Sequence, residues 1–295
     1  MLRFVDMTSS KATVTHVIPG RDRVGGVTSL GNDVFVMRCN SRQIEVYDAV
    51  TFTLQRCLTV LQFGFQHYGL AVCPSNKCLY ASDCGNNKVH RVELTGSNAV
   101  MQWSVARWPT GLTVNRAQHL IVVSRIENKL QEFTTHGTLL QNINLPPGIG
   151  CPWCVIDTTS GQYVVSYRRR RTSDGVYLVD MKGAVIHKYG VGLQKGSEVS
   201  DGQRSYQVMK MSDPAGLAID KHGNILVANT SNHRLLVFDH SLSSAHEMFV
   251  SVDRGLAGPF ALWYDKSRDR LYIGEWSGGR VIIIDHLKDF TTSRV

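Results

Sequence analysis

The stretch 216–239, GLAIDKHGNILVANTSNHRLLVFD, decides how this sequence folds because its pattern occurs more than once. The segments 69–93 (GLAVCPSNKCLYASDCGNNKVHRVE) and 261–285 (ALWYDKSRDRLYIGEWSGGRVIIID) repeat the same order of apolar and polar residues. Six copies account for almost the whole chain, and such internal repetition is the signature of a repeat architecture. The aligned anchor residues of the six copies are Val27, Leu70, Leu112, Val155, Leu217 and Leu262.

Each copy has the pattern of three short apolar strands joined by polar turns, followed by a looser fourth strand. The turns are rich in Asp, Asn, His and Gly, as in 220–224, which favours type I turns with a left-handed residue. Four strands in about 40 to 45 residues is the period of a propeller blade. We therefore predict an all-β, single-domain, six-bladed β-propeller. The predicted blades are about 24–60, 67–105, 108–147, 151–190, 211–252 and 256–287.

Two segments fall outside the regular copies. Residues 12–18 (ATVTHVI) alternate like a strand, whereas the last copy lacks a clear fourth strand. We expect this N-terminal strand to complete the last blade and close the ring, which removes an unpaired sheet edge. The long connection 191–213 either folds over one face of the ring or forms an inert surface loop.

The segments 83–89 (DCGNNKV) and 229–235 (NTSNHRL), each preceded by a GLAV or GLAI strand, resemble NHL repeats. The resemblance extends over about residues 12–286, with two or three copies that match well. It implies the propeller found at the C-terminus of TRIM-NHL proteins, several of which bind RNA on one face. Other NHL propellers bind proteins, and the amidating lyases of this fold are catalytic. The RING, B-box and coiled-coil parts of a TRIM protein are not in this sequence, so we expect an excised domain or a stand-alone propeller.

Composition narrows the class of protein. The 295 residues are 43% apolar and 19% charged, which excludes disordered, collagen-like and coiled-coil chains. No apolar run reaches the roughly 20 residues that span a bilayer, and the N-terminus has no secretory signal. We therefore expect a cytoplasmic protein without membrane contact. The seven cysteines are an odd number in a large chain, which favours thiols over a disulfide framework.

The net charge of +8 is concentrated on one side of the predicted ring. Connections in an antiparallel meander alternate between the two ends of the strands, so the loops between second and third strands share a face with the connections between blades. We call this the top face. Its segments contain 18 Lys and Arg against nine Asp and Glu, which accounts for the entire positive excess. They are 19–25, 38–43, 61–68, 83–88, 105–110, 124–129, 146–152, 167–175, 190–214, 229–234, 253–259 and 275–280.

Arginines interleaved with aromatic residues are typical of single-stranded RNA binding, because phosphates pair with cations and bases stack on rings. Our first hypothesis is an RNA-binding top face, with Tyr68, Tyr167 and Trp276 stacking on bases or wedging between them. Trp153 and Phe260 either stack in the same way or plug the central channel. The residues predicted to contact RNA are Arg38, Arg42, Tyr68, Lys88, Arg107, Arg125, Lys129, Tyr167, Arg168, Arg169, Arg170, Arg171, Arg234, Trp276 and Arg280.

The run of four arginines at 168–171 has two interpretations. It is either a solvated loop or localisation signal, or a clamp on phosphate oxygens, which arginine binds in a bidentate manner. We favour the phosphate clamp because the loop belongs to the basic top face.

Two further functions remain open. An acidic protein partner would use the same top face, with aromatic anchors. A metal-dependent hydrolase or lyase would use Asp83, Asn229 and Glu275, which share one repeat position and carry oxygen ligands suited to Ca²⁺. Arg38 at the equivalent position opposes a cation, and Asp or Asn there ordinarily caps its own turn. We therefore expect a non-enzymatic protein without metal, cofactor or obligate small molecule.

Overall fold

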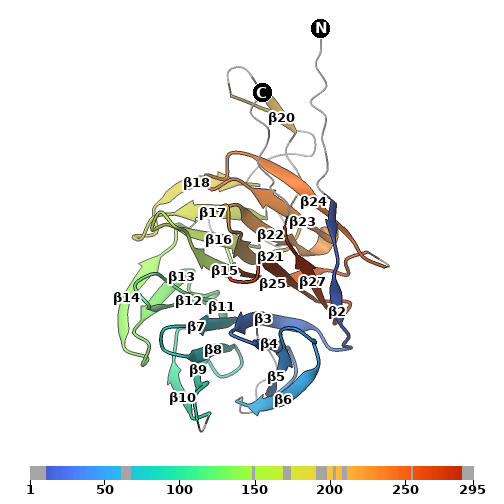
Figure 1. The fold of residues 1–295 in the computed structure, drawn as a ribbon. Helices are drawn as coiled ribbons and strands as arrows, with labels where there is room; N and C mark the ends of the chain where they lie inside the picture. The colour runs from blue at the N-terminus through green and yellow to red at the C-terminus, as the bar shows by residue number, and fades with distance from the viewer. Residues whose placement is uncertain are drawn as a thin grey trace.

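The computed structural model describes residues 11–60, 68–96, 98–147, 150–168, 174–190, 198–201, 204–207, 211–253 and 255–287, and all of its sheets but one two-stranded sheet form a ring of six blades (Figure 1). In blades 1 to 4 the first strand lies nearest the centre of the ring and the last lies at the rim, and in blades 5 and 6 an N-terminal strand is added at the rim. The predicted all-β, six-bladed propeller is confirmed. No helix in the described part of the chain is both long enough and apolar enough to cross a membrane.

The strand bounds follow the repeat. Blade 1 consists of β3 (Val24–Leu30), β4 (Asp33–Arg38), β5 (Gln43–Asp48) and β6 (Leu54–Thr59). Blade 2 consists of β7 (Leu70–Cys73), β8 (Cys78–Asp83), β9 (Lys88–Glu93) and β10 (Val100–Ser104). Blade 3 consists of β11 (Pro109–Val114), β12 (Leu120–Ser124), β13 (Lys129–Phe133) and β14 (Leu139–Asn144).

The second half of the ring has the same order. Blade 4 consists of β15 (Pro152–Asp157), β16 (Tyr163–Tyr167), β17 (Gly175–Val179) and β18 (Val185–Tyr189). Blade 5 consists of β21 (Pro214–Ile219), β22 (Ile225–Asn229), β23 (Arg234–Phe238) and β24 (Ala245–Ser251), with the short 3-10 helix η1 (Thr230–Asn232) before β23. Blade 6 contains β25 (Pro259–Asp265), β26 (Arg270–Glu275) and β27 (Val281–Asp285).

The N-terminal segment closes the ring, as predicted, but it serves two blades. Strand β2 (His16–Ile18) pairs antiparallel with β27 and becomes the fourth strand of blade 6. Strand β1 (Lys11–Thr13) pairs in parallel with β24 and adds a fifth strand to blade 5. One short segment therefore joins the rims of the last two blades.

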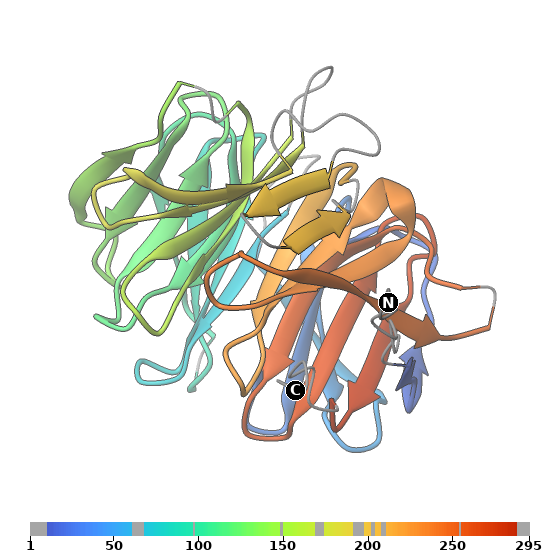
Figure 2. The same ribbon diagram turned by 90° about the horizontal axis from the view of Figure 1, so that it is seen from above.

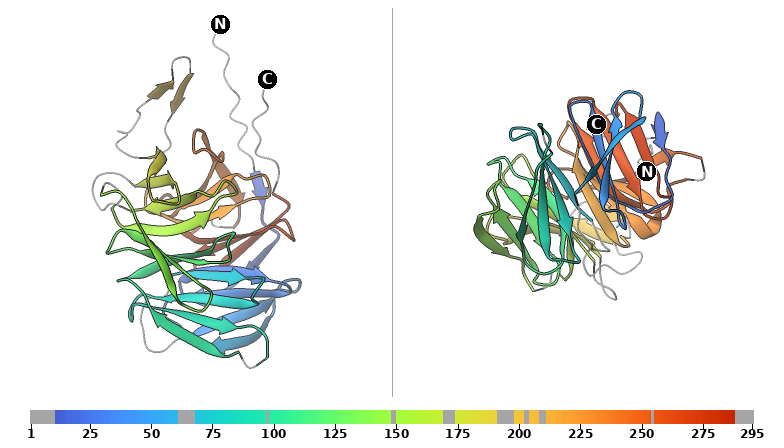
Figure 3. Two further views of the ribbon diagram at one scale, coloured as in Figure 1. Left: turned by 90° about the vertical axis from the view of Figure 1, so that its left-hand side faces the viewer. Right: turned by 90° about the horizontal axis from the view of Figure 1, so that it is seen from below.

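The long connection before blade 5 contains a hairpin of β19 (Glu198–Asp201) and β20 (Arg204–Gln207), which forms a two-stranded sheet of its own. The hairpin projects outward past the rim of the ring (Figures 1 and 3). This described part of the connection therefore does not cover the centre of the top face.

The core lies between neighbouring sheets, which Figure 2 shows from the side of the ring. Phe35 and Met37 of blade 1, for example, pack with Leu79 of blade 2 in one buried cluster. The inner three strands are buried on both faces, whereas β6 and β14 each bury only one residue, Leu58 and Ile143. The rim strands are therefore the amphipathic ones, which explains why their sequence pattern is the weakest.

The glycine of the GLA pattern permits the inner strands to approach one another closely. A Cβ atom on Gly69 would collide with the carbonyl oxygen of Thr110, and one on Gly216 would collide with that of Phe260. Cys154, at the same position of blade 4, is a small residue packed beside Gly111. A small residue is therefore required at this repeat position, because the six inner strands approach one another closely around a narrow channel.

Candidate interaction surface

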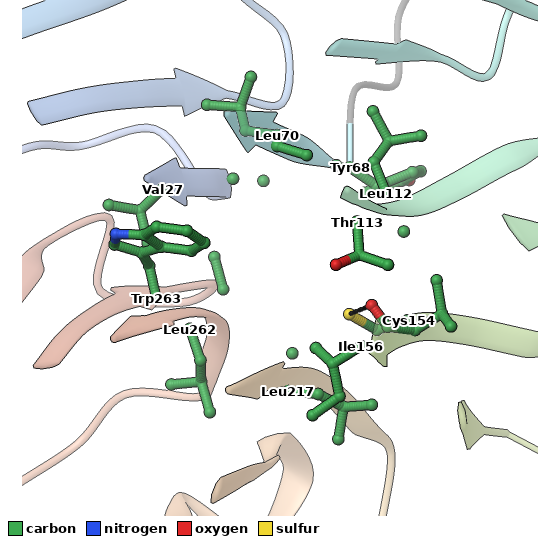
Figure 4. A pocket seen from close by; sticks show the side chains of 18 of the residues that line it. Val27, Tyr68, Leu70, Leu112, Thr113, Cys154, Ile156, Leu217, Leu262 and Trp263 are labelled. Atoms are coloured by element: carbon green, nitrogen blue, oxygen red, sulfur yellow. Dashed lines mark hydrogen bonds between the residues drawn. The ribbon is translucent and has the colours of Figure 1, made fainter. Parts of the chain in front are cut away.

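The central channel is lined by the innermost strands of all six blades (Figure 4). Its cavity of about 110 Å³ has mainly aliphatic walls, and all six anchor residues of the repeat lie along it. Thr113 and Cys154 add polar side-chain atoms to the backbone groups exposed along the wall, and burial raises the pKa of the Cys154 thiol to about 11. None of the described residues that line the channel has a charged side chain, so the charged groups of the site lie at its mouth.

Four aromatic side chains close the channel on the top face, and we call them the channel-mouth cluster: Tyr68, Trp153, Phe260 and Trp276. The ring centres of Tyr68 and Trp153 lie 4.9 Å apart, and those of Phe260 and Trp276 lie 4.5 Å apart. Trp153 and Phe260 are only 5% and 3% exposed, whereas Tyr68 and Trp276 are half-buried. Of the two roles weighed for Trp153 and Phe260, this placement corresponds to plugging the channel.

Arginine side chains lie over this cluster. The guanidinium carbon of Arg168 is 4.1 Å from the ring centre of Trp153 and 5.3 Å from that of Phe260. The guanidinium carbon of Arg125 is 5.0 Å from Trp153 and 5.7 Å from the ring of Trp108. A guanidinium above an aromatic face gains electrostatic attraction to the ring, so the rings hold these cations at the mouth of the channel.

A third arginine covers the other side of the cluster. The guanidinium carbon of Arg23 is 4.7 Å from the ring centre of Trp276, whose ring also packs against Phe260. Arg23 and Trp108 belong to this surface although neither is predicted as a contact residue. Both lie in the short connections that precede the first strand of a blade, and that position is the signal that points to them.

The positive charge at the mouth is poorly solvated. The pKa of the Arg168 guanidinium is lowered to about 10, chiefly by burial, with a contribution from the neighbouring charge of Arg125, while Asp213 opposes the shift. The ion pair between Arg168 and Asp213 is long, at 3.8 Å, and the aspartate is half-exposed. Burial also raises the pKa of Tyr68 to about 12. The mouth is therefore a partly dehydrated cationic site, where an incoming anion is bound more strongly than at a hydrated surface.

Two residues predicted to contact RNA are buried, which corrects their placement on an open surface. Arg38 donates from Nε to Oε2 of Glu45 at 3.1 Å and from Nη1 to the carbonyl oxygen of Asp22 at 3.1 Å. Tyr167 is fully buried, and its ring centre lies 4.5 Å from that of Tyr177. Arg38 therefore ties blade 1 to its neighbouring connection, and Tyr167 packs inside blade 4.

Other predicted residues remain on the top face but differ in their surroundings. Arg42 and Arg107 are exposed, and Lys88 is half-buried at the start of β9. Three others form ion pairs within their own blades: Lys129 with Glu127 at 2.6 Å, Arg234 with Glu247 at 2.7 Å, and Arg280 with Glu275 at 2.6 Å. Arg169, Arg170 and Arg171 lie outside the described residues. The structure thus brings Arg125, Arg168, Tyr68 and Trp276 together at the channel mouth and leaves the rest around it.

The aligned positions Asp83, Asn229 and Glu275 serve their own blades. The Asp83 carboxylate accepts from the backbone and side chain of Asn86 at 3.1 and 2.8 Å. The Asn229 side-chain oxygen accepts from the Ser212 backbone at 2.8 Å, and Glu275 accepts from the Ala257 backbone at 2.8 Å. Within the described ranges, no three His, Cys, Asp or Glu side chains are grouped closely enough to hold a metal ion.

Comparison with known proteins supports the fold. The family model of the NHL repeat matches residues 211–238, which include β21, β22 and β23. No curated protein sequence matches the chain. The chain is a six-bladed β-propeller that carries an NHL repeat in its fifth blade.

Solved structures with the same fold belong to diverse proteins. Hydrazine synthase from Kuenenia stuttgartiensis has a TM-score of 0.64 at 14% identity, covering 97% of this chain and 97% of that one. Virginiamycin B lyase from Staphylococcus aureus has a TM-score of 0.66 at 9% identity, covering 92% and 99%. A chain of a nidogen–laminin complex has a TM-score of 0.64 at 16% identity, covering 85% and 88%. At these identities the likeness shows the fold alone.

Proposed function

We propose that this chain is a binding module, without catalytic activity, that holds an acidic segment of a partner protein on its top face. The observation that carries the proposal is the layer of arginines Arg23, Arg125 and Arg168 on the channel-mouth cluster. Aromatic rings hold these cations in place, and of the three only Arg168 forms an ion pair with a carboxylate in the described part of the chain. Aromatic and arginine anchors at the centre of a patch are typical of protein–protein hot spots.

The surrounding surface supports the same function. Arg21, Arg42 and Arg107 are exposed around the mouth, which extends the positive potential beyond the three central arginines. Complementary charge across an interface raises the association rate and selects against partners of the wrong sign. The nidogen–laminin complex is an example of this fold in a protein assembly.

RNA is the second candidate, favoured by the charge excess of the top face and by the arginine run 168–171. Sequence-specific binding of single strands requires open ring faces on which bases stack. Tyr167 is buried, and the ring of Trp276 is packed against Phe260 and covered by Arg23. With these rings covered, RNA would bind mainly through contacts to its phosphates, so we rank RNA as the second candidate ligand.

The aliphatic channel and the local roles of Asp83 and Glu275 support a non-catalytic protein. Asp83 caps the turn after β8, and Glu275 is held by Arg280 and the Ala257 backbone. A hydrolase or lyase of this fold needs titratable groups that converge on the channel, whereas the described residues that line it here are mainly glycine, aliphatic and aromatic residues without a charged side chain.

The proposal is tested by selecting two libraries on the same immobilised protein, a display library of random dodecapeptides and a pool of randomised RNA. Each selection is run at low and at physiological salt. The protein is compared with a variant that carries Arg42→Glu and Arg107→Glu. The matched control carries Lys182→Glu and Lys266→Glu, which make the same change in charge at exposed residues in turns of the opposite face.

We expect acidic dodecapeptides to be enriched on the wild-type protein and on the control, and to be lost from the top-face variant. Enrichment of RNA instead, with an affinity that falls by roughly 0.7 log units per phosphate contact for each log unit of salt, would replace this proposal with the RNA function. Recovery of neither library would contradict both.

A further inference from the structure

Arg125 and Arg168 are the two top-face arginines that share one ring. Both guanidinium carbons lie within 5.0 Å of the ring centre of Trp153. Arg125 has no ion pair and no side-chain hydrogen bond to any described residue, and its Nε is buried. The Nη2 of Arg168 is likewise buried without a hydrogen-bond partner among the described residues. Two neighbouring cations therefore retain donors that this part of the chain does not use.

Such an arrangement costs folding free energy. Burying a charge without full compensation is unfavourable, and a second like charge nearby adds repulsion. The carboxylate nearest to Arg168 is that of Asp213, which lies 3.8 Å from Nε and accepts a hydrogen bond from Ser231 at 2.7 Å. The Glu127 carboxylate, on the turn that carries Arg125, is paired with Lys129 at 2.6 Å. Arg168 also donates from Nε to the carbonyl oxygen of Pro214 at 3.4 Å, but the described residues compensate the two charges only in part, so an anion from a partner would stabilise them.

We propose that Arg125 and Arg168 form a seat for one carboxylate, the side chain of an Asp or Glu in an acidic protein segment. This inference rests on the proposed function and specifies the residue that anchors the partner at the ring centre. A guanidinium group binds a carboxylate through two parallel hydrogen bonds, and Trp153 holds both guanidinium groups at the mouth of the channel.

The surroundings favour a single carboxylate over a chain of phosphates. Asp213 lies 3.8 Å from Arg168, and Asp174 also acts on the charge of Arg168, so these carboxylates would repel a ligand that carries a negative charge on every unit. A peptide places one carboxylate on the seat while neutral residues pass the acidic groups. The aromatic rings beneath the arginines are packed against each other, so they add support to the seat and do not serve as stacking platforms.

The test uses the acidic dodecapeptide that binds best in the display selection, labelled with fluorescein and measured by fluorescence polarisation. A series of peptides replaces each Asp or Glu in turn by Asn or Gln. The proteins are the wild type, Arg125→Gln, Arg168→Gln and the matched control Arg56→Gln, an arginine paired with Asp33 on the rim strand β6. Circular dichroism and thermal unfolding verify that each variant is folded. A glutamine variant that is not folded is replaced by Arg125→Lys or Arg168→Lys at the same position, which keeps the charge but lacks the planar fork.

We expect Arg125→Gln and Arg168→Gln each to weaken peptide binding by about tenfold or more, since a hydrogen bond to a charged group is lost. At one peptide position the carboxylate-to-amide change weakens binding to the wild type by a similar factor and has little further effect on these variants. That coupling in a double-mutant cycle identifies the carboxylate on the seat. Arg56→Gln leaves the affinity within about twofold.

The outcomes separate this inference from the function on which it rests. If acidic peptides bind but Arg125→Gln and Arg168→Gln retain wild-type affinity, or if every effect is additive, the seat is wrong and the top-face function stands. If no acidic peptide is selected, the function itself fails. If a randomised RNA is retained and is released by Arg125→Gln, the two arginines bind phosphate and the carboxylate assignment is overturned.

Discussion

The two faces of the ring treat their charged groups in opposite ways. On the face opposite the top, aspartates are satisfied by their own turns: Asp220 accepts from the backbones of His222 and Asn224 at 2.9 and 2.8 Å. On the top face, Arg125 and Arg168 rest on Trp153, and the described chain supplies them with few hydrogen-bond acceptors. The charge of Asp220 is therefore satisfied within its own turn, whereas those of Arg125 and Arg168 remain available to a partner.

The difference follows from distance along the chain. A turn aspartate finds its donors two to four residues away, so the hairpin that creates the charge also neutralises it. The top-face arginines come from different blades and meet only when the ring is complete. Substitutions on the two faces are therefore expected to affect stability and binding in different proportions.

The largest effect is expected from Trp153→Ala, which removes the ring that supports Arg125 and Arg168. Truncating a buried aromatic side chain costs about 3–5 kcal/mol of unfolding free energy, through lost burial and the cavity left behind. Chemical denaturation measures the loss, and binding of an acidic peptide is lost with it. Trp153→Phe is the control, because it retains a ring for the guanidinium groups. A loss below about 1 kcal/mol would show that the cluster does not stabilise the ring.

On the opposite face, Asp265→Ala separates stability from binding. The Asp265 carboxylate is buried and accepts from Ser29 Oγ at 2.8 Å and from the Ser267 backbone at 2.9 Å. Removing it leaves the buried Ser29 hydroxyl without its acceptor, which costs about 2–3 kcal/mol of unfolding free energy. Denaturation measures this loss, while fluorescence polarisation at a temperature where the variant is folded gives the wild-type peptide affinity. Weakened peptide binding would contradict the assignment of function to the top face.

The sequence predicts the ring and its closure because each blade is a local pattern. Anchors such as Leu70 and Leu217 recur at a fixed position, and the structure places both on the channel. The alternation in 12–18 predicts a closing strand, but not its division between two blades, because the parallel pairing of β1 with β24 depends on contacts between distant segments.

The candidate site is harder to predict than the fold. Their shared repeat position predicts that Tyr68 and Trp153 lie at the channel mouth, because equivalent positions of the blades converge at the centre of a ring, and the structure confirms it. The repeat places Arg38 at the last residue of β4 and Arg125 one position after the end of β12, but it does not predict that Arg38 is buried against Glu45 while Arg125 lies on Trp153. The partner of an arginine is set by neighbouring blades, and one blade's sequence carries no information about them.

A smaller change in stability, of the opposite sign, is expected from Arg168→Met. Burial depresses the pKa of Arg168, so the charged form is less favourable in the folded state than in the unfolded state throughout the neutral range. Replacing a buried charge by an apolar side chain of similar length is often neutral or stabilising. We expect unfolding free energy to be unchanged or raised by about 1 kcal/mol at neutral pH, with loss of peptide binding.

Arg280→Met is the comparison, because it leaves the buried Glu275 without its ion pair and destabilises the protein. Destabilisation by Arg168→Met as large as that by Arg280→Met would show that Arg168 serves folding and not binding.

The smallest effect is expected for the stability at acidic pH of a turn on the face opposite the top. Burial alone would raise the pKa of Asp239, but hydrogen bonds from Ser243 and Ser244 outweigh it and lower the pKa to about 2. A carboxyl whose pKa is depressed by folding contributes stability above its unfolded pKa, and this contribution is lost as the pH falls toward the folded value. The turn is partly solvated, so the contribution is at most about 1 kcal/mol. In urea denaturation, the stability difference between wild type and Asp239→Asn should therefore be larger at pH 5 than at pH 3.

The peptide affinity of Asp239→Asn at neutral pH should equal that of the wild type, because the turn is distant from the channel mouth. A difference in stability that is independent of pH would mean that the turn, and not the carboxylate charge, determines the effect of the substitution.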